Sequence, residues 1–349
     1  MQSDKITKIF GLTTGALSAL TIATSITIYD KMFSRYERPN YEITAGLCNY
    51  LLLKKQLPRE ELFFPSDDVL LKAYFYPSNH PKGLVIISHG SHAGADDYLP
   101  FISFFVKNHF HVFAFDNKGT YDSQGDSTVG MCESLVDLYH ALVFLNNQEK
   151  YNLYPFFLFG HSWGGYAVCS VLSLCQNIKA CASISAFNDA YQLILNKGVE
   201  KAGKPALLSK PFLDAYQKYL FGSFTEFTAI DGINKQNTPT LIAHGVEDNI
   251  ISFKKQSIIA YQDRITNPNV IYYNGEALQS GHNSILYSNS AIQYQNEIAQ
   301  KIIKMEARKQ DKLSYEEKKL FNQSVNHYLY SEVNLELMNQ IIQLFSSVL

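Results

Sequence analysis

Short apolar runs alternate with longer stretches of helical periodicity over most of this chain. Two runs rich in apolar residues, 61–64 and 69–76, flank the turn-forming Ser66-Asp67-Asp68 and predict a pair of strands. Six nearly continuous apolar runs predict further strands at 83–88, 111–115, 154–159, 180–185, 240–243 and 270–273. Strands that are apolar on both faces and separated by helical stretches indicate an α/β fold, with a mostly parallel sheet covered by helices on both faces.

The alternation stops between two of these strands. Residues 187–237 show helical periodicity and are too long for a plain connection, so we expect a helical lid over the edge of the sheet. The tail from about Ala291 is mostly helical and ends in an amphipathic helix at 335–344. Before the first strand, a basic and aromatic linker at 31–41 precedes a helix expected to run to about Lys55.

The N-terminus carries an uncharged stretch. Residues 9–29 are 21 residues without a charge, preceded by Lys5 and Lys8 and followed by Asp30 and Lys31. This length suffices for a helix that crosses a bilayer, although seven Ser and Thr residues dilute its apolar character. We therefore expect membrane association through a single N-terminal helix.

Two other interpretations of this stretch stay open, a cleaved secretory signal and an ordinary helix. Ala23-Thr24-Ser25 offers a weak cleavage site, which would make the protein secreted. Basic residues flank both ends too evenly for the positive-inside rule to orient an anchor. The expected division is residues 1–38 as anchor or signal plus linker, and 39–349 as the main domain with its lid and helical C-terminal extension.

Composition narrows the class of protein. With 46% apolar and 18% charged residues the chain can bury a large core. Because 30 basic residues are balanced by 32 acidic ones, no nucleic-acid partner is expected. The cysteines lie at 48, 132, 169, 175 and 181, and none has zinc-ligand spacing. We expect buried free thiols in a reducing compartment, which favours a catalytic domain on the cytoplasmic side, and no metal site.

A serine in a glycine-rich turn is the first candidate for chemistry. Gly160-His161-Ser162-Trp163-Gly164 follows directly on a predicted strand and precedes a helical stretch. Such a strand-turn-helix junction brings backbones too close for Cβ atoms, and it exposes the serine hydroxyl above the edge of the sheet. Ser162 is therefore the predicted nucleophile.

A serine hydroxyl needs a base, and the base needs an orienting acid. Asp248 follows one predicted strand and His282 follows the next, so both should reach the edge that holds Ser162. We assign Asp248 as the acid and His282 as the base, with the neighbouring Glu247 as the rival for the acid. For the oxyanion hole we expect backbone N–H groups of Trp163, directly after the nucleophile, and of Ser91.

These motifs, in this order, resemble a known family. His89-Gly90 with Tyr98, then Asp116-Asn117-Lys118-Gly119 with Ser123 and Gly125, is similar to the serine aminopeptidase (S33) and monoacylglycerol lipase branch of the α/β-hydrolases. The resemblance continues through the Ser162, Asp248 and His282 motifs, and it implies the α/β-hydrolase fold. The chain departs from the pattern at His92 and Tyr121, where glycines are common, and at Lys118, where arginine is common.

The resemblance and the residues together predict a serine hydrolase that needs no cofactor. The expected activity is cleavage of small-molecule or lipid carboxylic esters through an acyl-enzyme on Ser162. Two alternatives remain: a serine aminopeptidase-type peptidase with the same chemistry, and a catalytically inactive binding module.

Overall fold

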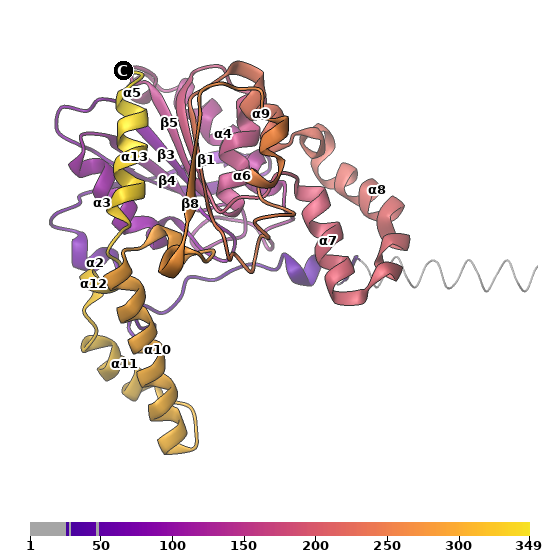
Figure 1. Cartoon of the computed structure of the whole chain (residues 1–349). Coiled ribbons are helices and arrows are strands. Elements are labelled where there is room, and N and C mark those ends of the chain that lie inside the picture. The colour runs from indigo at the N-terminus through magenta and orange to yellow at the C-terminus, as the bar shows by residue number, and fades with distance from the viewer. Residues whose placement is uncertain (1–25, 28, 47–48) are drawn as a thin grey trace, which may run out of the picture.

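The computed structural model describes residues 26–27, 29–46 and 49–349 (Figure 1). Within these residues an eight-stranded sheet has the strand order β1-β2-β4-β3-β5-β6-β7-β8. Its strands are β1 (Glu60–Ser66), β2 (Val69–Tyr76), β3 (Leu84–Ser88), β4 (His111–Phe115), β5 (Phe156–His161), β6 (Ile178–Ile184), β7 (Thr240–Gly245) and β8 (Val270–Gly275). All eight predicted strands are present, each close to its expected position.

The direction of the strands places their carboxyl ends together. β1 and β2 form an antiparallel pair and β2 runs antiparallel to β4, whereas β4, β3, β5, β6, β7 and β8 are parallel to one another. In the register of the central strands, Ser88 pairs with Gly160 and His161 pairs with Ile184. The loops that follow β3, β5, β7 and β8 therefore start from one edge, as expected for a site of this fold class.

Helices cover both faces of the sheet, as the sequence predicted. α4 (Glu133–Asn146), α6 (Trp163–Ser170) and α9 (Ala229–Gln236) share one apolar cluster with one face of the sheet. α3 (Leu99–Lys107) and α13 (Leu335–Ser346) share the other cluster with the opposite face. The fold is that of an α/β-hydrolase, because a mostly parallel sheet is enclosed between two helical layers.

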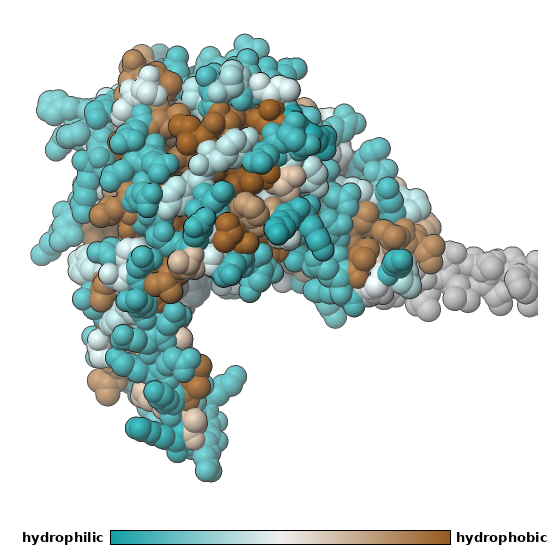
Figure 2. All heavy atoms as spheres, in the orientation of Figure 1, coloured by the Kyte–Doolittle hydropathy of each residue, from teal (hydrophilic) through white to brown (hydrophobic). Residues whose placement is uncertain are grey.

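The expected insertion at 187–237 is helical but not uniform. α7 (Ala190–Ala202) and α8 (Lys210–Phe221) project from the body, whereas α9 packs on α6 (Figure 1). The connection between α7 and α8 exposes Leu207 and Leu208, and apolar side chains gather on this projection (Figure 2). Its role as a lid stays a prediction.

The C-terminal extension forms a helical arm. α10 (Asn289–Lys309) leads away from the sheet, and α11 (Tyr315–Gln323) and α12 (His327–Tyr330) bring the chain back towards it (Figure 1). Asn322 of α11 donates from its side-chain amide to the Tyr41 carbonyl at 2.7 Å, which ties the arm to the segment before the sheet. The predicted amphipathic helix at 335–344 corresponds to α13, whose apolar side faces the core.

The helix expected to run to Lys55 is wrong in extent. Residues 41–46 form turns, and the helix α2 covers only Tyr50–Leu53. Gly46 has a φ of +92°, which lies outside helical backbone space, and the Asn49 side chain caps a new helix by accepting from the Leu51 N–H.

Residues 29–38, expected to serve as part of a linker, instead lie along the domain. Tyr36 forms an isolated parallel bridge with Thr120, and Ser34 forms an antiparallel one with Ser127.

The predicted anchor at 9–29 falls almost entirely outside the described residues, as does Cys48. Within the described part of the chain, no helix combines the length and apolar character needed to span a bilayer. Cys132, Cys169, Cys175 and Cys181 are free thiols, as predicted.

Candidate active site

Ser162 occupies a strained turn between β5 and α6. Its backbone has φ +55° and ψ −113°, a left-handed conformation that non-glycine residues rarely adopt. The two flanking glycines permit the turn: a Cβ on Gly160 would lie 2.2 Å from the Gly164 carbonyl oxygen, and one on Gly164 would lie 2.0 Å from the Ser88 oxygen. The predicted strand-turn-helix junction is therefore present, and its strain serves to present the Ser162 hydroxyl.

The structure brings the three predicted triad side chains together. His282 Nε2 lies 2.9 Å from Ser162 Oγ, and His282 Nδ1 lies 2.6 Å from Asp248 Oδ2. All three residues are buried. With Nδ1 protonated and donating to the carboxylate, His282 presents the Nε2 lone pair to the hydroxyl, which is the arrangement that proton abstraction by a general base requires.

Asp248 is held as a carboxylate by a full set of donors. Its Oδ1 accepts from the backbone N–H groups of Ile250 at 2.8 Å and Ile251 at 2.9 Å. Its Oδ2 lies 3.0 Å from His244 Nε2 as well as near His282. Although burial opposes ionisation, the hydrogen bonds from His244 and His282 hold the pKa of the Asp248 carboxyl well below its usual range.

The rival acid Glu247 faces another group. Its carboxylate accepts from the Ser280 hydroxyl at 2.9 Å, and the Glu247 backbone N–H donates to the Ser280 carbonyl at 2.9 Å. Glu247 thus braces the loop that carries His282, while Asp248 makes the contact with the imidazole. Between the two acids that the sequence left open, the geometry selects Asp248.

The predicted oxyanion donors line the same cleft. Trp163 is the first residue of α6, so its backbone N–H has no acceptor within the helix. Ser91 lies in the turn after β3, and both residues line a cleft of about 510 Å³. His92, which stands where relatives often have glycine, has φ +57° and so keeps the left-handed backbone that glycine favours.

Two buried residues with no role assigned from the sequence connect these loops. Tyr98 Oη accepts from the Gly90 backbone N–H at 2.9 Å and lies 2.9 Å from His161 Nδ1. His161 Nε2 lies 3.3 Å from the His282 carbonyl oxygen, which also accepts from the Ser185 hydroxyl at 2.8 Å. Burial lowers the pKa of His161 to about 3, so this imidazole is neutral. The network joins the loop after β3 to the loop that carries His282.

His89 fixes the same loop from the other side. Its Nε2 accepts from the Asn117 backbone N–H at 2.9 Å, which leaves Nδ1 to donate to the Gly90 carbonyl at 2.7 Å. Burial lowers the pKa of His89 to about 4, which keeps the ring neutral and preserves this pattern of donor and acceptor. The conformation around Ser91 is thus determined by two buried, uncharged histidine contacts.

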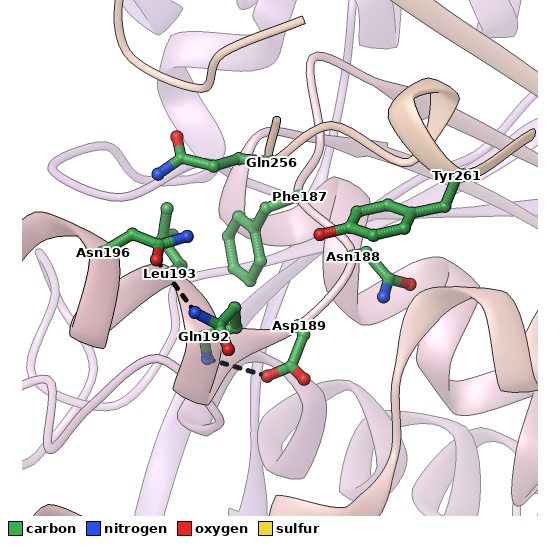
Figure 3. A pocket seen from close by; sticks show the side chains of 8 residues that line it. All are labelled: Phe187, Asn188, Asp189, Gln192, Leu193, Asn196, Gln256 and Tyr261. Atoms are coloured by element: carbon green, nitrogen blue, oxygen red, sulfur yellow. Dashed lines mark hydrogen bonds between the residues drawn. The ribbon is translucent and has the colours of Figure 1, made fainter. Parts of the chain in front are cut away.

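A second cavity lies at the base of the α7–α8 projection, between α7 and the segment after β7 (Figure 3). It measures about 190 Å³ and has a largely polar lining. Asp189 caps α7 there by accepting from the Gln192 backbone N–H, and Gln192 donates to the Asn196 side chain at 2.8 Å. Other polar groups of the lining are used outside α7: Asn188 accepts from the Ile230 N–H at 3.0 Å, and Gln256 accepts from the Ser252 N–H at 3.2 Å.

No group of three or more His, Cys, Asp and Glu side chains in the described residues is arranged to hold a metal ion.

Comparison with known proteins identifies a similar family. Residues 79–210 match the model of the serine aminopeptidase S33 family, a segment that contains Ser91, Ser162 and Trp163. Over this segment the chain is similar to the S33 branch of the α/β-hydrolases, and it has their fold.

Two kinds of relative agree with this assignment. The hydrolase is 23% identical over 210 residues to the lysophosphatidylserine lipase ABHD12 of Danio rerio, covering 57% of this chain and 52% of the relative. It thus spans about half the length of the curated relative that it matches. This match therefore does not show that the hydrolase acts on the substrate of that lipase.

Solved structures support the fold. An esterase of Pyrococcus furiosus, Pf2001, superposes with a TM-score of 0.53 at 18% identity, covering 79% of this chain and 98% of the esterase. Est1E of Butyrivibrio proteoclasticus, solved with ferulic acid bound, gives a TM-score of 0.50 at 14% identity over 71% of this chain and 99% of Est1E.

Proposed function

We propose that this hydrolase cleaves carboxylic esters, of acyl or lipid-like type, through an acyl-enzyme on Ser162. The observation that carries the proposal is the continuous contact from Asp248 through His282 to the Ser162 hydroxyl, with distances of 2.6 and 2.9 Å. A binding module would have no need to keep Ser162 in a strained backbone conformation within hydrogen-bond distance of the His282 imidazole. The geometry therefore favours the enzyme over the inactive alternative.

In the proposed reaction, His282 Nε2 takes the proton as Ser162 Oγ attacks the ester carbonyl carbon. Backbone N–H groups of Ser91 and Trp163 donate to the oxygen that becomes negative. The imidazolium, oriented by Asp248, then protonates the leaving alkoxide, and the acyl group stays on Ser162. Water activated by the same imidazole attacks the acyl-enzyme, releases the carboxylic acid and restores the serine.

An ester is favoured over a peptide as substrate by the state of the acidic residues in the insertion. A peptidase that removes N-terminal residues would need a free carboxylate to bind the substrate amine. Asp189 caps α7, Glu200 pairs with Lys197 at 3.1 Å and Asp214 pairs with Lys218 at 3.5 Å. These three carboxylates already have local partners, which makes them less available to a substrate amine.

A fluorophosphonate probe tests the nucleophile. We expect the probe to label the wild-type protein at Ser162, and Ser162→Ala to lose both labelling and ester hydrolysis while its circular dichroism and melting temperature stay unchanged. Ser173→Ala, in the helical stretch after α6, serves as the matched control. Labelling that persists in Ser162→Ala would contradict the assignment.

A substrate panel separates the two activities. Hydrolysis of p-nitrophenyl esters should exceed hydrolysis of aminoacyl-anilides by the wild-type protein. A preference for the anilides would overturn the ester proposal while retaining the triad.

A further inference from the structure

The segment that enters the domain from the N-terminus is attached next to the active site. The Phe33 carbonyl accepts from the Thr128 backbone N–H at 2.7 Å, and Tyr36 exchanges backbone hydrogen bonds of 2.9 Å with the loop after β4. Arg35 donates to the carbonyls of Ser123 at 2.9 Å and Gly125 at 2.8 Å, and also to that of Tyr121. These contacts hold residues 33–36 in one position on the body of the enzyme.

The same segment forms one wall of the cleft that holds the candidate oxyanion donors. Met32, Phe33, Ser34 and Tyr36 line the cleft of about 510 Å³ on one side. The rest of its lining consists of Ser91, His92, Thr128, Met131 and Trp163. Met32, Phe33, Met131 and Trp163 provide apolar surface in this cleft.

The position of His282 determines which part of an ester this cleft can accept. In the proposed reaction the leaving oxygen must come within hydrogen-bond distance of His282 Nε2, so the alcohol lies on the His282 side of the carbonyl carbon. Neither His282 nor any other residue of its loop lines the cleft. The acyl chain, which points away from the leaving group, is the part that meets the cleft.

The other end of the segment packs on the α7–α8 projection. Phe33 and Ile194 of α7 share a small apolar cluster with Tyr29. The Tyr29 and Tyr216 rings meet edge to face at 5.3 Å, and the Tyr216 hydroxyl lies 3.0 Å from the Asp30 carboxylate. The wall is thus supported both by the domain and by the insertion.

We propose that residues 32–36 are the acyl-binding wall of the enzyme, and that Met32 and Met131, which both line the cleft, set the length of acyl chain it accepts. The inference rests on the proposed ester hydrolysis at Ser162. It gives the N-terminal segment a part in specificity, because the wall comes from residues that precede the first strand of the sheet.

Two substitutions that change the size of the cleft in opposite directions test the inference. Met32 is partly exposed, at 37%, so Met32→Trp can narrow the cleft without disrupting the core. Met131→Ala widens it. Met305→Trp, in α10 of the arm, is the matched control. The measurement is kcat/KM for p-nitrophenyl esters from acetate to dodecanoate, together with acetate esters of alcohols of increasing length.

Met32→Trp should lower the ratio of long-chain to short-chain kcat/KM by about tenfold or more, the scale expected for steric exclusion from an apolar pocket. Hydrolysis of the acetate ester and labelling by a small fluorophosphonate should persist. Met131→Ala should raise the same ratio, and Met305→Trp should leave it unchanged.

Three results would overturn parts of the argument separately. Every variant could hydrolyse esters and react with the probe while the dependence of kcat/KM on acyl length stays the same. Residues 32–36 would then not form the acyl-binding wall, and the proposed function would stand. If the profile moves only in the alcohol series, the cleft binds the leaving group, and the acyl assignment is wrong. If the wild-type protein neither hydrolyses esters nor reacts with the probe, the proposed function fails first.

Discussion

Tyr98 Oη and His161 Nδ1 lie 2.9 Å apart, although 63 positions separate the two residues in the sequence. Through this contact the Gly90 N–H, the phenol, the imidazole and the His282 carbonyl form one buried chain of hydrogen bonds. The loop proposed to stabilise the oxyanion and the loop proposed to carry the base are therefore positioned relative to each other by two side chains that perform no chemistry in the reaction.

Tyr98→Phe should weaken this positioning. The change leaves the buried Gly90 N–H without its acceptor, which costs about 1–3 kcal/mol in the free energy of unfolding. We expect kcat for a short-chain ester to fall by about tenfold or more, with little change in KM, because the reacting groups lose alignment while the cleft keeps its shape.

Tyr76→Phe is the matched control for Tyr98→Phe. Tyr76, the last residue of β2, is also fully buried and lies away from the triad. Its hydroxyl accepts a hydrogen bond from the Arg59 guanidinium at 3.2 Å. Denaturation should show a loss of stability in both variants, and steady-state kinetics should show a loss of kcat only in Tyr98→Phe. Equal kinetics in the two variants would mean that the Tyr98 contact is merely structural.

Asp248→Asn and Glu247→Gln separate the two adjacent acids. Only Asp248 contacts the imidazole of His282, so Asp248→Asn should lower kcat by on the order of 10⁴-fold, through loss of the imidazole tautomer and of charge stabilisation. Glu247→Gln retains a side chain that can accept from Ser280, and kcat should stay within a few-fold of wild type. A large loss of kcat in Glu247→Gln, with Asp248→Asn active, would reverse the assignment.

The sequence could predict those parts of the site that depend on residues close together in the chain. The strands and the turn at Ser162 follow from local patterns, since apolar runs and paired glycines act over a few residues. The order of Ser162, Asp248 and His282 along parallel strands then predicts that they meet. Sequence patterns favoured Asp248 but kept Glu247 as a rival, because the choice depends on which way adjacent side chains point within one turn.

Longer-range features were beyond sequence patterns. The contact of Tyr98 with His161 joins the short helix after β3 to the end of β5, and the relative position of the two is set by the whole sheet. The attachment of residues 32–36 beside Ser91 depends on single hydrogen bonds to an irregular loop, and no periodicity encodes it. The helix expected to run to Lys55 was mispredicted because a local helical pattern does not show that Gly46 takes a positive φ.

Ionisation of Asp137 should lower the stability of the protein as pH rises from about 4 towards 7. Burial raises the pKa of Asp137 to about 7 from its ordinary value of 3.8. In this window the folded state holds a proton that the unfolded state has released, so the free energy of unfolding decreases with rising pH, by up to about 1.4 kcal/mol per pH unit for one group.

Asp137→Asn should remove this decrease in the free energy of unfolding with rising pH. Chemical denaturation at several pH values measures the slope of the free energy against pH. Asp68→Asn is the control, because the exposed Asp68 pairs with Lys118, and the hydrogen bond from that lysine lowers the pKa of its carboxyl. Asp68 is ionised in both states above its ordinary pKa, so its removal should leave the slope between pH 5 and 7 as it is. An unchanged slope in Asp137→Asn would show that this carboxyl ionises normally in the folded protein.

Two glycine-to-alanine substitutions should have opposite effects on stability. A Cβ on Gly164 would lie 2.0 Å from the carbonyl oxygen of Ser88, a backbone atom at the end of a buried strand that cannot move aside cheaply. Gly164→Ala should therefore lower the free energy of unfolding by at least about 1–3 kcal/mol and abolish ester hydrolysis, because the turn at Ser162 must open.

In contrast, a Cβ on Gly198, inside α7, would meet only Ala206 Cβ at 3.8 Å. Gly198→Ala should raise stability by about 0.5–1 kcal/mol through its better helix propensity, with kcat unchanged. Thermal melts and ester assays on both variants check the pair, and a Gly164→Ala enzyme as active and stable as wild type would show that the turn is looser than its backbone contacts require.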